Sequence, residues 1–165
     1  MEVRDRRAEG GAIELREVPV AVPWTKDYDA YRGEGPMRWA GRWDLVSWRL
    51  FAAFDGAMHV GGAVVAYDTP GVDLLEGRRD LAVLWDLRVH PAHRRRGVAR
   101  ALLAAAKSWA RERGCRELKV ETQDVNVPAC RLYTSVGFVL TDARTGAYPP
   151  LPDEVQLIFR RPLAP

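Results

Sequence analysis

The sequence predicts a single α/β domain built on one mixed β-sheet, and three observations support this prediction. The chain has 165 residues, of which 47% are hydrophobic and 28% are charged, as in an ordinary globular domain with its own core. Residues 46–67 hold two apolar stretches on either side of Asp55-Gly56, which is a strong signal for an antiparallel hairpin. Residues 81–122 follow a strand–helix–strand pattern, and a right-handed crossover makes those two strands parallel.

Each expected element follows from its local pattern of apolar and turn-forming residues. Strands are predicted over residues 11–18, 46–54, 58–67, 81–89, 117–122, 138–141 and 154–160, and helices over residues 98–113 and 126–137. Pro91 ends the strand before it, because proline cannot donate to a ladder. Gly61-Gly62 inside a strand indicates a bulge or a close backbone approach.

The strand over residues 81–89 should be buried on both faces, because seven of its nine residues are apolar. Strict alternation places one set of side chains together on one face, namely Leu81, Val83, Trp85, Leu87 and Val89. Asp86 lies on the other face, where its carboxylate needs a partner or has a raised pKa through desolvation. Two interpretations stay open for Asp86: an ion pair with an arginine, and a catalytic carboxylate.

The turn between this strand and the next helix has the features of an anion site. Residues 93–99, His-Arg-Arg-Arg-Gly-Val-Ala, lead directly into the helix, whose first N–H groups have no internal partner and lie at the positive end of its dipole. Gly97 allows close backbone approach, and the arginines add charge. Neither G-x-x-x-x-G-K-[ST] nor G-x-G-x-x-G after a strand occurs, so a P-loop and a dinucleotide-binding fold are not expected. A diphosphate is the expected ligand.

Composition and charge argue against several other classes of protein. The net charge is only +3. No aromatic-interleaved basic stripe accompanies Arg94-Arg95-Arg96, so nucleic-acid binding is not expected. No apolar run approaches the ~20 residues of a membrane span, and residues 1–7 do not lead into a secretory h-region. Cys115 and Cys130 are too few for a disulfide framework, and no cluster indicates a metal site. We expect a cytoplasmic protein without a bound metal.

Two motifs resemble those of the GNAT (GCN5-related) N-acetyltransferases. Arg94-x-x-Gly97-x-Ala99, following a strand that ends in Leu87-Arg88-Val89, is similar to the coenzyme A signature of that family. Asn126-x-x-Ala129-x-x-x-Tyr133, followed by Gly137-Phe138, resembles its second motif. The likeness covers residues 46–160, and within the family residues 120–130 and 148–159 are similar to streptothricin acetyltransferases.

The resemblance implies the GNAT fold and the place of its cofactor. The fold is a mixed sheet of six to seven strands with helices on both faces and a V-shaped splay between the fourth and fifth strands, residues 81–89 and 118–122. Acetyl-CoA (coenzyme A) would lie in this splay, with the pantetheine paired to the backbone of Leu87 and Val89 and the pyrophosphate held by N–H groups of residues 95–99. The residues expected at the cofactor are Leu87, Arg88, Val89, Arg94, Arg95, Arg96, Gly97, Val98, Ala99, Arg100, Asn126, Ala129 and Tyr133.

The resemblance also implies a reaction, the transfer of an acetyl group to a primary amine of a small molecule, with a streptothricin-like antibiotic as a candidate. Asp86 is the candidate acceptor of the amine proton, and by similarity Tyr133 gives a proton to the departing CoA thiolate. Trp85 stands where those relatives carry another acid beside Asp86, which leaves the drug substrate open. Two alternatives are a protein or peptide N-acetyltransferase and a non-catalytic acyl-CoA-binding module.

A single domain, residues 1–165, is expected, with residues 1–45 as a segment on the substrate side and residues 46–160 as the core. The aromatic stretch that includes Trp39 and Trp43 either packs over the sheet or forms a lid whose rings contact a cationic substrate. Cys130 is interpreted as a small core residue. The expected partner is a small amine; the exposed edges of such a sheet are also compatible with a homodimer.

Overall fold

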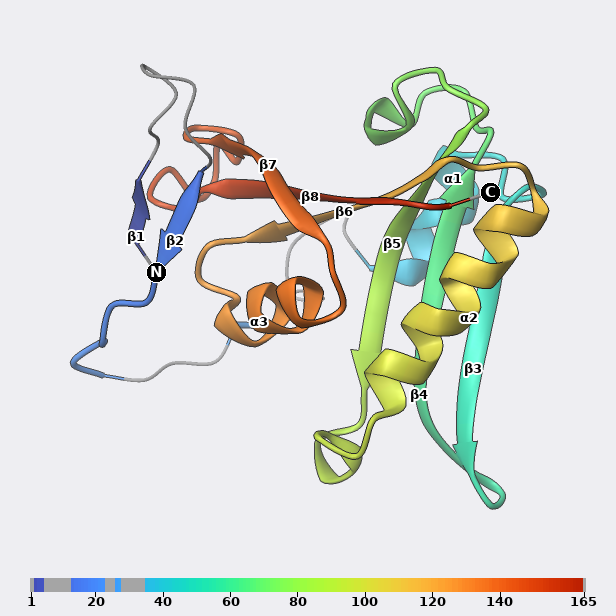
Figure 1. Ribbon diagram of the computed structural model, residues 1–165, viewed down its shortest axis with the longest axis horizontal. Helices are drawn as coiled ribbons and strands as arrows, with labels where there is room; N and C mark the ends of the chain where they lie inside the picture. The colour runs from blue at the N-terminus through green and yellow to red at the C-terminus, as the bar shows by residue number, and fades with distance from the viewer. Residues whose placement is uncertain (1, 5–12, 23–25, 28–34, 165) are drawn as a thin grey trace.

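The computed structural model describes residues 2–4, 13–22, 26–27 and 35–164 (Figure 1). The strands are β1 (Glu2–Arg4), β2 (Glu14–Arg16), β3 (Arg49–Asp55), β4 (Met58–Tyr67), β5 (Leu81–Val89), β6 (Glu117–Gln123), β7 (Val139–Arg144) and β8 (Gln156–Pro162). The α-helices are α1 (Trp39–Arg42), α2 (Val98–Glu112) and α3 (Val127–Ser135), and the 3₁₀ turns are η3 (Pro36–Arg38), η4 (Asp73–Leu75) and η5 (Pro91–His93). Every strand and helix predicted from the sequence is present, with ends that differ by a few residues.

Six strands form the central sheet in the order β3-β4-β5-β6-β8-β7. The β5–β6 pair is parallel and its neighbours are antiparallel, so the prediction of a mixed sheet is confirmed. The strand expected over residues 11–18 does not join this sheet, because its described part, β2, pairs with β1 in a separate two-stranded sheet.

The predicted splay is present between β5 and β6. Their pairing covers only Leu81–Leu84 opposite Glu117–Val120, about half of each strand. Beyond that point β5 continues alongside β4, whereas β6 turns away with β8, as the crossed directions of these strands in Figure 1 show. The sheet therefore opens in its middle and exposes one edge of residues 85–89.

A β-bulge at Trp85 changes which side chains of β5 share a face. Asp86 lies opposite Val64 and Leu84 opposite Val65, so Trp85 is an extra residue in β5. As a result Leu87 and Val89 pack on the α2 side of the sheet, whereas Val83 and Trp85 pack on the other side. The prediction that all five odd-numbered residues share a face is wrong, because a bulge shifts the alternation by one residue.

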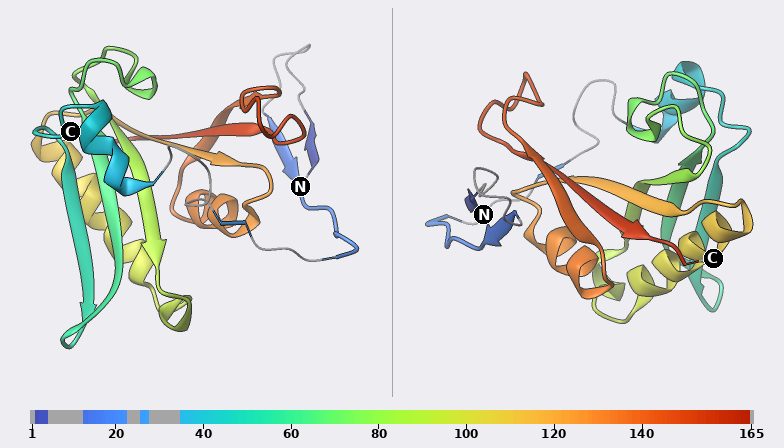
Figure 2. Two further views of the ribbon diagram at one scale, coloured as in Figure 1. Left: turned by 180° about the vertical axis from the view of Figure 1, so that it is seen from behind. Right: turned by 45° about the horizontal axis from the view of Figure 1, so that its top comes forward.

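The two faces of the sheet are covered differently. Helices α2 and α3 cover one face, where they enclose the main core with β4, β5, β6 and β8. The other face carries α1, η4 and a cluster of tryptophans, and Figure 2 shows α1 on the side opposite α2. In this tryptophan cluster, formed by Trp39, Trp43, Trp48 and Trp85, neighbouring ring centroids lie 5.0–6.5 Å apart. Helices on both faces are thus confirmed.

The close approach predicted at Gly61-Gly62 is also present. A Cβ atom on Gly61 would lie 2.7 Å from the carbonyl oxygen of Arg88, which is too short for any side chain. Gly61 therefore lets β4 approach β5 on the strand segment that borders the opening.

The described part of the N-terminal segment is tied to the C-terminal half of the domain. Lys26 pairs with the buried carboxylate of Glu154, and Glu17 pairs with Arg131 of α3. The other aromatic residues of the N-terminal segment, Trp24, Tyr28 and Tyr31, lie outside the described residues. Among the residues that the structure describes, no helix has the length and apolar character needed to cross a membrane.

Candidate functional site

The exposed edge of β5 presents its backbone to the opening. The N–H of His90 donates to the carbonyl of Val60 at 2.8 Å, so His90 and, two residues earlier, Arg88 direct their peptide groups toward β4. Leu87 and Val89 alternate with them and direct their N–H and C=O groups into the opening. Arg94 Nε, which donates to the Val89 carbonyl at 3.3 Å, reaches that carbonyl from outside the sheet. The backbone groups of Leu87 and Val89, where the pantetheine is predicted to pair, therefore face the opening.

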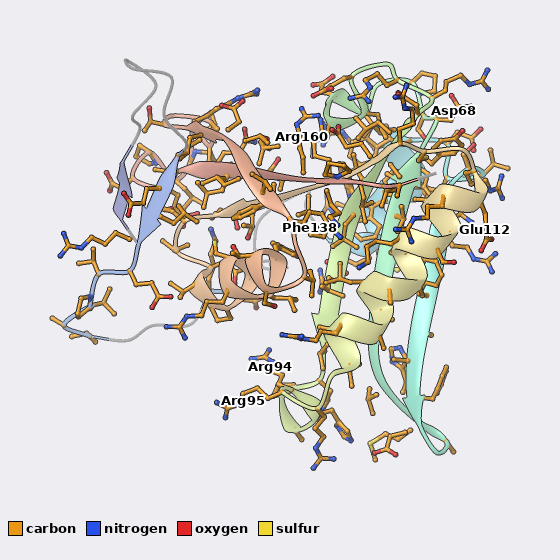
Figure 3. The ribbon with its side chains drawn as sticks, viewed as in Figure 1. Asp68, Arg94, Arg95, Glu112, Phe138 and Arg160 are labelled. Atoms are coloured by element: carbon orange, nitrogen blue, oxygen red, sulfur yellow. The ribbon has the colours of Figure 1, made fainter. Side chains whose placement is uncertain are left out.

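The turn before α2 has the form expected of an anion site. Arg95 has φ 59° and Gly97 φ 86°, so the chain turns sharply and aims the N–H groups at the start of α2 outward. Among the side chains that the structure describes, none caps these groups. The three arginines of the turn are exposed, and Figure 3 shows Arg94 and Arg95 at the end of α2 opposite Glu112. The positive end of a 15-residue helix and three guanidinium groups are thus concentrated here.

Helix α3 supplies the other wall of the opening. Arg100 of α2 donates to Ser135 Oγ of α3 at 3.1 Å, which links the two helices. Asn126 caps α3 as predicted, since its side-chain oxygen accepts from the N–H of Ala129 at 3.3 Å. Tyr133 is 6% exposed, and its ring packs 5.7 Å from Phe138 and 5.8 Å from Phe159. The helices that carry the two sequence motifs therefore both pack against the same face of the sheet, and the Tyr133 ring is buried in the main core.

Asp86 forms an ion pair with Arg88, as the first of its two interpretations predicted. Both carboxylate oxygens accept from Arg88 Nε at 2.9 Å, and the Asp86 side chain is 23% exposed. The bulge at Trp85 directs Asp86 and Arg88 to the face opposite α2. Arg88 was predicted at the cofactor; its side chain lies on that opposite face, and its peptide groups point toward β4.

A pocket of about 410 Å³ lies on this same face, beside the point where β5 and β6 separate. Trp43 and Trp85 form its aromatic wall, and Glu121, Lys119 and Arg160 contribute charge from β6 and β8. Trp43 packs in the tryptophan cluster and also lines the pocket. Asp86 is not among the lining residues.

Glu121 is the carboxylate that the sequence analysis did not identify. It follows Val120, the last β6 residue paired with β5, and so lies where the two strands part. Tyr148 donates its hydroxyl to one carboxylate oxygen at 2.7 Å, and Gln156 Nε2 donates to the other at 2.9 Å. Burial and the neighbouring Glu121 charge raise the pKa of Tyr148 far above its usual value, so Tyr148 remains a donor. One sequence signal was available: Leu118 and Val120 are core residues, so Glu121 must face the opposite side of the sheet.

The floor of the pocket is a network of ion pairs. Lys119 is 2% exposed, and its ammonium lies 2.7 Å from Glu76 and also contacts the carbonyl of Leu74. Arg160 joins Glu76 to Glu117 across β8 and β6. Burial would raise the pKa of Glu76, but hydrogen bonds and charge from Arg160 and Lys119 lower it to about 2. The network fixes η4 against the sheet and so shapes one side of the pocket.

The two cysteines are unsuited to nucleophilic chemistry. Cys115 and Cys130 are both buried, and burial raises the pKa of each thiol to about 11. The prediction that Cys130 is a core residue is confirmed, since it packs between α3 and the sheet. In the described part of the chain, no group of three or more histidine, cysteine or acidic side chains could hold a metal ion.

Comparison with known proteins identifies relatives of this chain. A sequence model of the acetyltransferase (GNAT) family matches residues 14–138. The streptothricin acetyltransferase of Escherichia coli is 40% identical over 80 residues, which are 48% of this chain and 46% of that protein. The streptothricin acetyltransferase of Streptomyces lavendulae is 33% identical over 141 residues, 84% of this chain and 69% of that protein. The matched region thus spans from about half to about two thirds of these relatives' length.

Solved structures share the fold. Nourseothricin acetyltransferase superposes with a TM-score of 0.72 at 31% identity, over 99% of this chain and 83% of that one. A Bacillus anthracis protein assigned as a streptothricin acetyltransferase, solved in complex with acetyl coenzyme A, superposes with a TM-score of 0.61 at 28% identity, over 70% of this chain and 62% of that one.

Proposed function

Because this chain belongs to the acetyltransferase (GNAT) family, we propose that it transfers the acetyl group of acetyl-CoA to a primary amine of a small molecule. One observation carries the proposal. The opening between β5 and β6 is bordered on one face by the start of α2 with its arginines, and on the other by the pocket that holds Trp43, Trp85 and Glu121. An anionic cofactor and an acceptor amine could therefore approach the same strand from opposite faces.

The residues of the cofactor side fit acetyl-CoA. The N–H groups of residues 95–99 and the turn arginines suit a pyrophosphate, because an uncapped helix start offers both donors and positive potential. The backbone of Leu87 and Val89 suits the amides of the pantetheine arm, which would add to the sheet edge like a strand. Asn126 and Ala129 would border that arm from α3. When bound, acetyl-CoA supplies an activated acetyl thioester.

The acceptor amine must lose a proton before it can attack, since a lysine-like amine has a pKa of ~10.4. Asp86 was the expected proton acceptor, and it remains a candidate through a bridging water. We favour Glu121, because it lines the pocket where the strands part, whereas Asp86 does not line the pocket and is engaged with Arg88. Tyr148 and Gln156 would hold the Glu121 carboxylate in a fixed orientation.

Tyr133 is the proposed donor to the departing thiolate. Its ring is held by Phe138 and Phe159, which supports a fixed orientation of its hydroxyl. An ordered donor of this kind lowers the barrier for thiolate departure without moving during the reaction.

Streptothricin or a similar amine-bearing antibiotic is the proposed substrate. The support comes from the names of the two relatives above and from the pocket, where the faces of Trp43 and Trp85 and the Glu121 carboxylate suit a single amine group. We further propose that residues 1–45 lie on the substrate side, as the Lys26–Glu154 pair beside the 148–156 loop suggests. Acetyl-CoA use is consistent with a cytoplasmic location.

A thiol-release assay tests the proposal. Purified protein with acetyl-CoA is offered streptothricin, polyamines, aminoglycosides and a lysine peptide in parallel, and acetyl-CoA binding is measured separately. We expect fast release with streptothricin and little with the peptide. Preference for the peptide would favour a peptide N-acetyltransferase, and binding without turnover on any amine would favour a non-catalytic acyl-CoA-binding module.

A further inference from the structure

The outer edge of β3 combines exposed apolar side chains with strand backbone that no described strand pairs. In the central sheet β3 has β4 on one side and, within the described residues, no strand on the other; Figure 1 shows it as the outermost strand. On the face opposite α2, Leu50 is 70% exposed and Phe54 is 62% exposed. Proteins usually protect such an edge with a charge, a proline or a bulge. Residues 50–54 contain no charge or proline, and the bulge near the end of β3 has its extra residue, Val60, in β4.

The sequence of β3 is complementary to itself in one antiparallel register. In a two-fold arrangement centred on Ala52, Arg49 faces Asp55 of the partner subunit, and Leu50 faces Phe54 of the partner subunit. Opposite charges and large apolar side chains placed directly across strands both stabilise antiparallel pairing. Symmetry repeats each pair, so four favourable contacts form at once, and a slip by two residues in either direction removes them all.

The structure leaves the charged ends of β3 able to make these contacts. Arg49 is exposed, and the Asp55 side chain is 67% exposed, although it also lies 3.6 Å from His93 Nε2. Leu50, Ala52 and Phe54 are all exposed, so the centre of the strand presents small and apolar groups to a second copy.

We propose that two copies of this chain associate through their β3 edges, which joins the two sheets into one continuous sheet around a two-fold axis. Such an interface is isologous, as in most homodimers, and it covers Leu50 and Phe54. The opening between β5 and β6 lies beyond β4 from this edge and stays accessible. The inference is therefore independent of the proposed acetyl transfer.

Charge reversal tests the register directly. Arg49→Glu alone sets like charges against Asp55 at both ends of the interface, Asp55→Arg alone does the same against Arg49, and the double variant restores opposite charges. Sedimentation equilibrium should show a dimer for the wild type, dissociation constants raised roughly tenfold or more for each single variant, and recovery in the double variant. A monomeric wild type, or dimers indifferent to the single changes, would overturn the proposal.

A cysteine variant provides a second test that leaves packing nearly unchanged. Ala52→Cys should form an intermolecular disulfide under mild oxidation, because position 52 of one subunit meets the same position of the other subunit across the axis. Ala57→Cys, in the β3–β4 turn, is the matched control and should not cross-link, since the axis separates it from its copy by several residues. The two native cysteines are buried and give little background. Absence of the Ala52→Cys product, or equal cross-linking of the control, would exclude this interface.

Discussion

At the scale of single residues, the proposed chemistry depends on which carboxylate faces the acceptor amine. Asp86 and Glu121 both lie near the separation of β5 and β6, but their hydrogen bonds differ. Both carboxylate oxygens of Asp86 accept from Arg88 Nε, so Asp86 is engaged in an ion pair on the face opposite α2. Glu121 accepts from the hydroxyl of Tyr148 and the amide of Gln156, which orient it at the pocket wall.

Glu121→Gln should therefore lower kcat for acetyl transfer by about 10²-fold or more at neutral pH, because a neutral amide keeps the shape but cannot accept a proton. Acetyl-CoA affinity should be nearly unchanged. Steady-state kinetics with a saturating amine would measure this, with Asp86→Asn as the matched comparison. A larger decrease in kcat for Asp86→Asn than for Glu121→Gln would indicate that Asp86 is the base.

Tyr133→Phe should lower kcat by about 10²-fold while acetyl-CoA binding and folding change little. The substitution removes only the hydroxyl and keeps the ring contacts with Phe138 and Phe159. Turnover can be followed by thiol release and binding by calorimetry. Unchanged turnover would rule out Tyr133 as the proton donor.

Candidate site residues could be predicted from the sequence where they belong to a short local motif. Asn126 combines an N-cap residue with a following proline and alanine, so its place at the start of α3 could be predicted, and the structure confirms it. Glu121 could not be recognised in this way, because its partners Tyr148 and Gln156 lie 27 and 35 residues away in the chain. Only folding brings these three side chains together.

At the scale of elements, the bulge in β5 and the glycine in β4 shape the strand that borders the opening. The bulge at Trp85 turns Asp86 and Arg88 away from the α2 side of the sheet, and Gly61 lets β4 follow β5 closely. The sequence predicted both strands with their observed ends, but it did not predict the face of each side chain. The bulge could not be recognised from the pattern of apolar residues, because its extra residue, Trp85, is itself apolar.

Gly61→Ala should destabilise the domain by about 1–3 kcal/mol, because its Cβ would lie 2.7 Å from the Arg88 carbonyl and the strands would have to separate. Urea unfolding measures the loss. Gly41→Ala is the matched control, since nothing lies within 4 Å of its added Cβ, and its stability should be unchanged or slightly higher. Equal stability of both variants would show that the approach at Gly61 is not tight.

At the scale of the whole molecule, an ion-pair network holds η4 against strands β6 and β8 on the pocket side. Glu76 joins Lys119 of β6 and Arg160 of β8, and Arg160 also pairs with Glu117. The sequence predicted the strands from their apolar periodicity. It could not predict this network, because Glu76 lies in an irregular loop whose position depends on the tryptophan cluster beneath it.

The ion-pair network makes the stability of the folded domain depend on pH in the acidic range. The pKa of Glu76 is about 2 in the folded protein against an ordinary value of 4.5, so its stabilising charge is complete above pH 4.5 and is lost as the pH falls toward 2. Urea midpoints should decline over this range, and Glu76→Gln should be less stable at neutral pH with a shallower acid decline. Glu112→Gln, at the exposed end of α2, should keep near wild-type stability at neutral pH. An acid decline as steep in Glu76→Gln as in the wild type would contradict this role.

The central claim is that acetyl-CoA binds where β5 and β6 separate. Amide hydrogen exchange, measured with and without acetyl-CoA, tests it most directly because it reports on the backbone groups in question. We expect slower exchange at Leu87 and Val89 and at the turn that leads into α2, residues 95–99, with the outer strands β3 and β7 unchanged. Protection confined to any other part of the sheet, or no protection under conditions where acetyl-CoA is bound, would contradict the account.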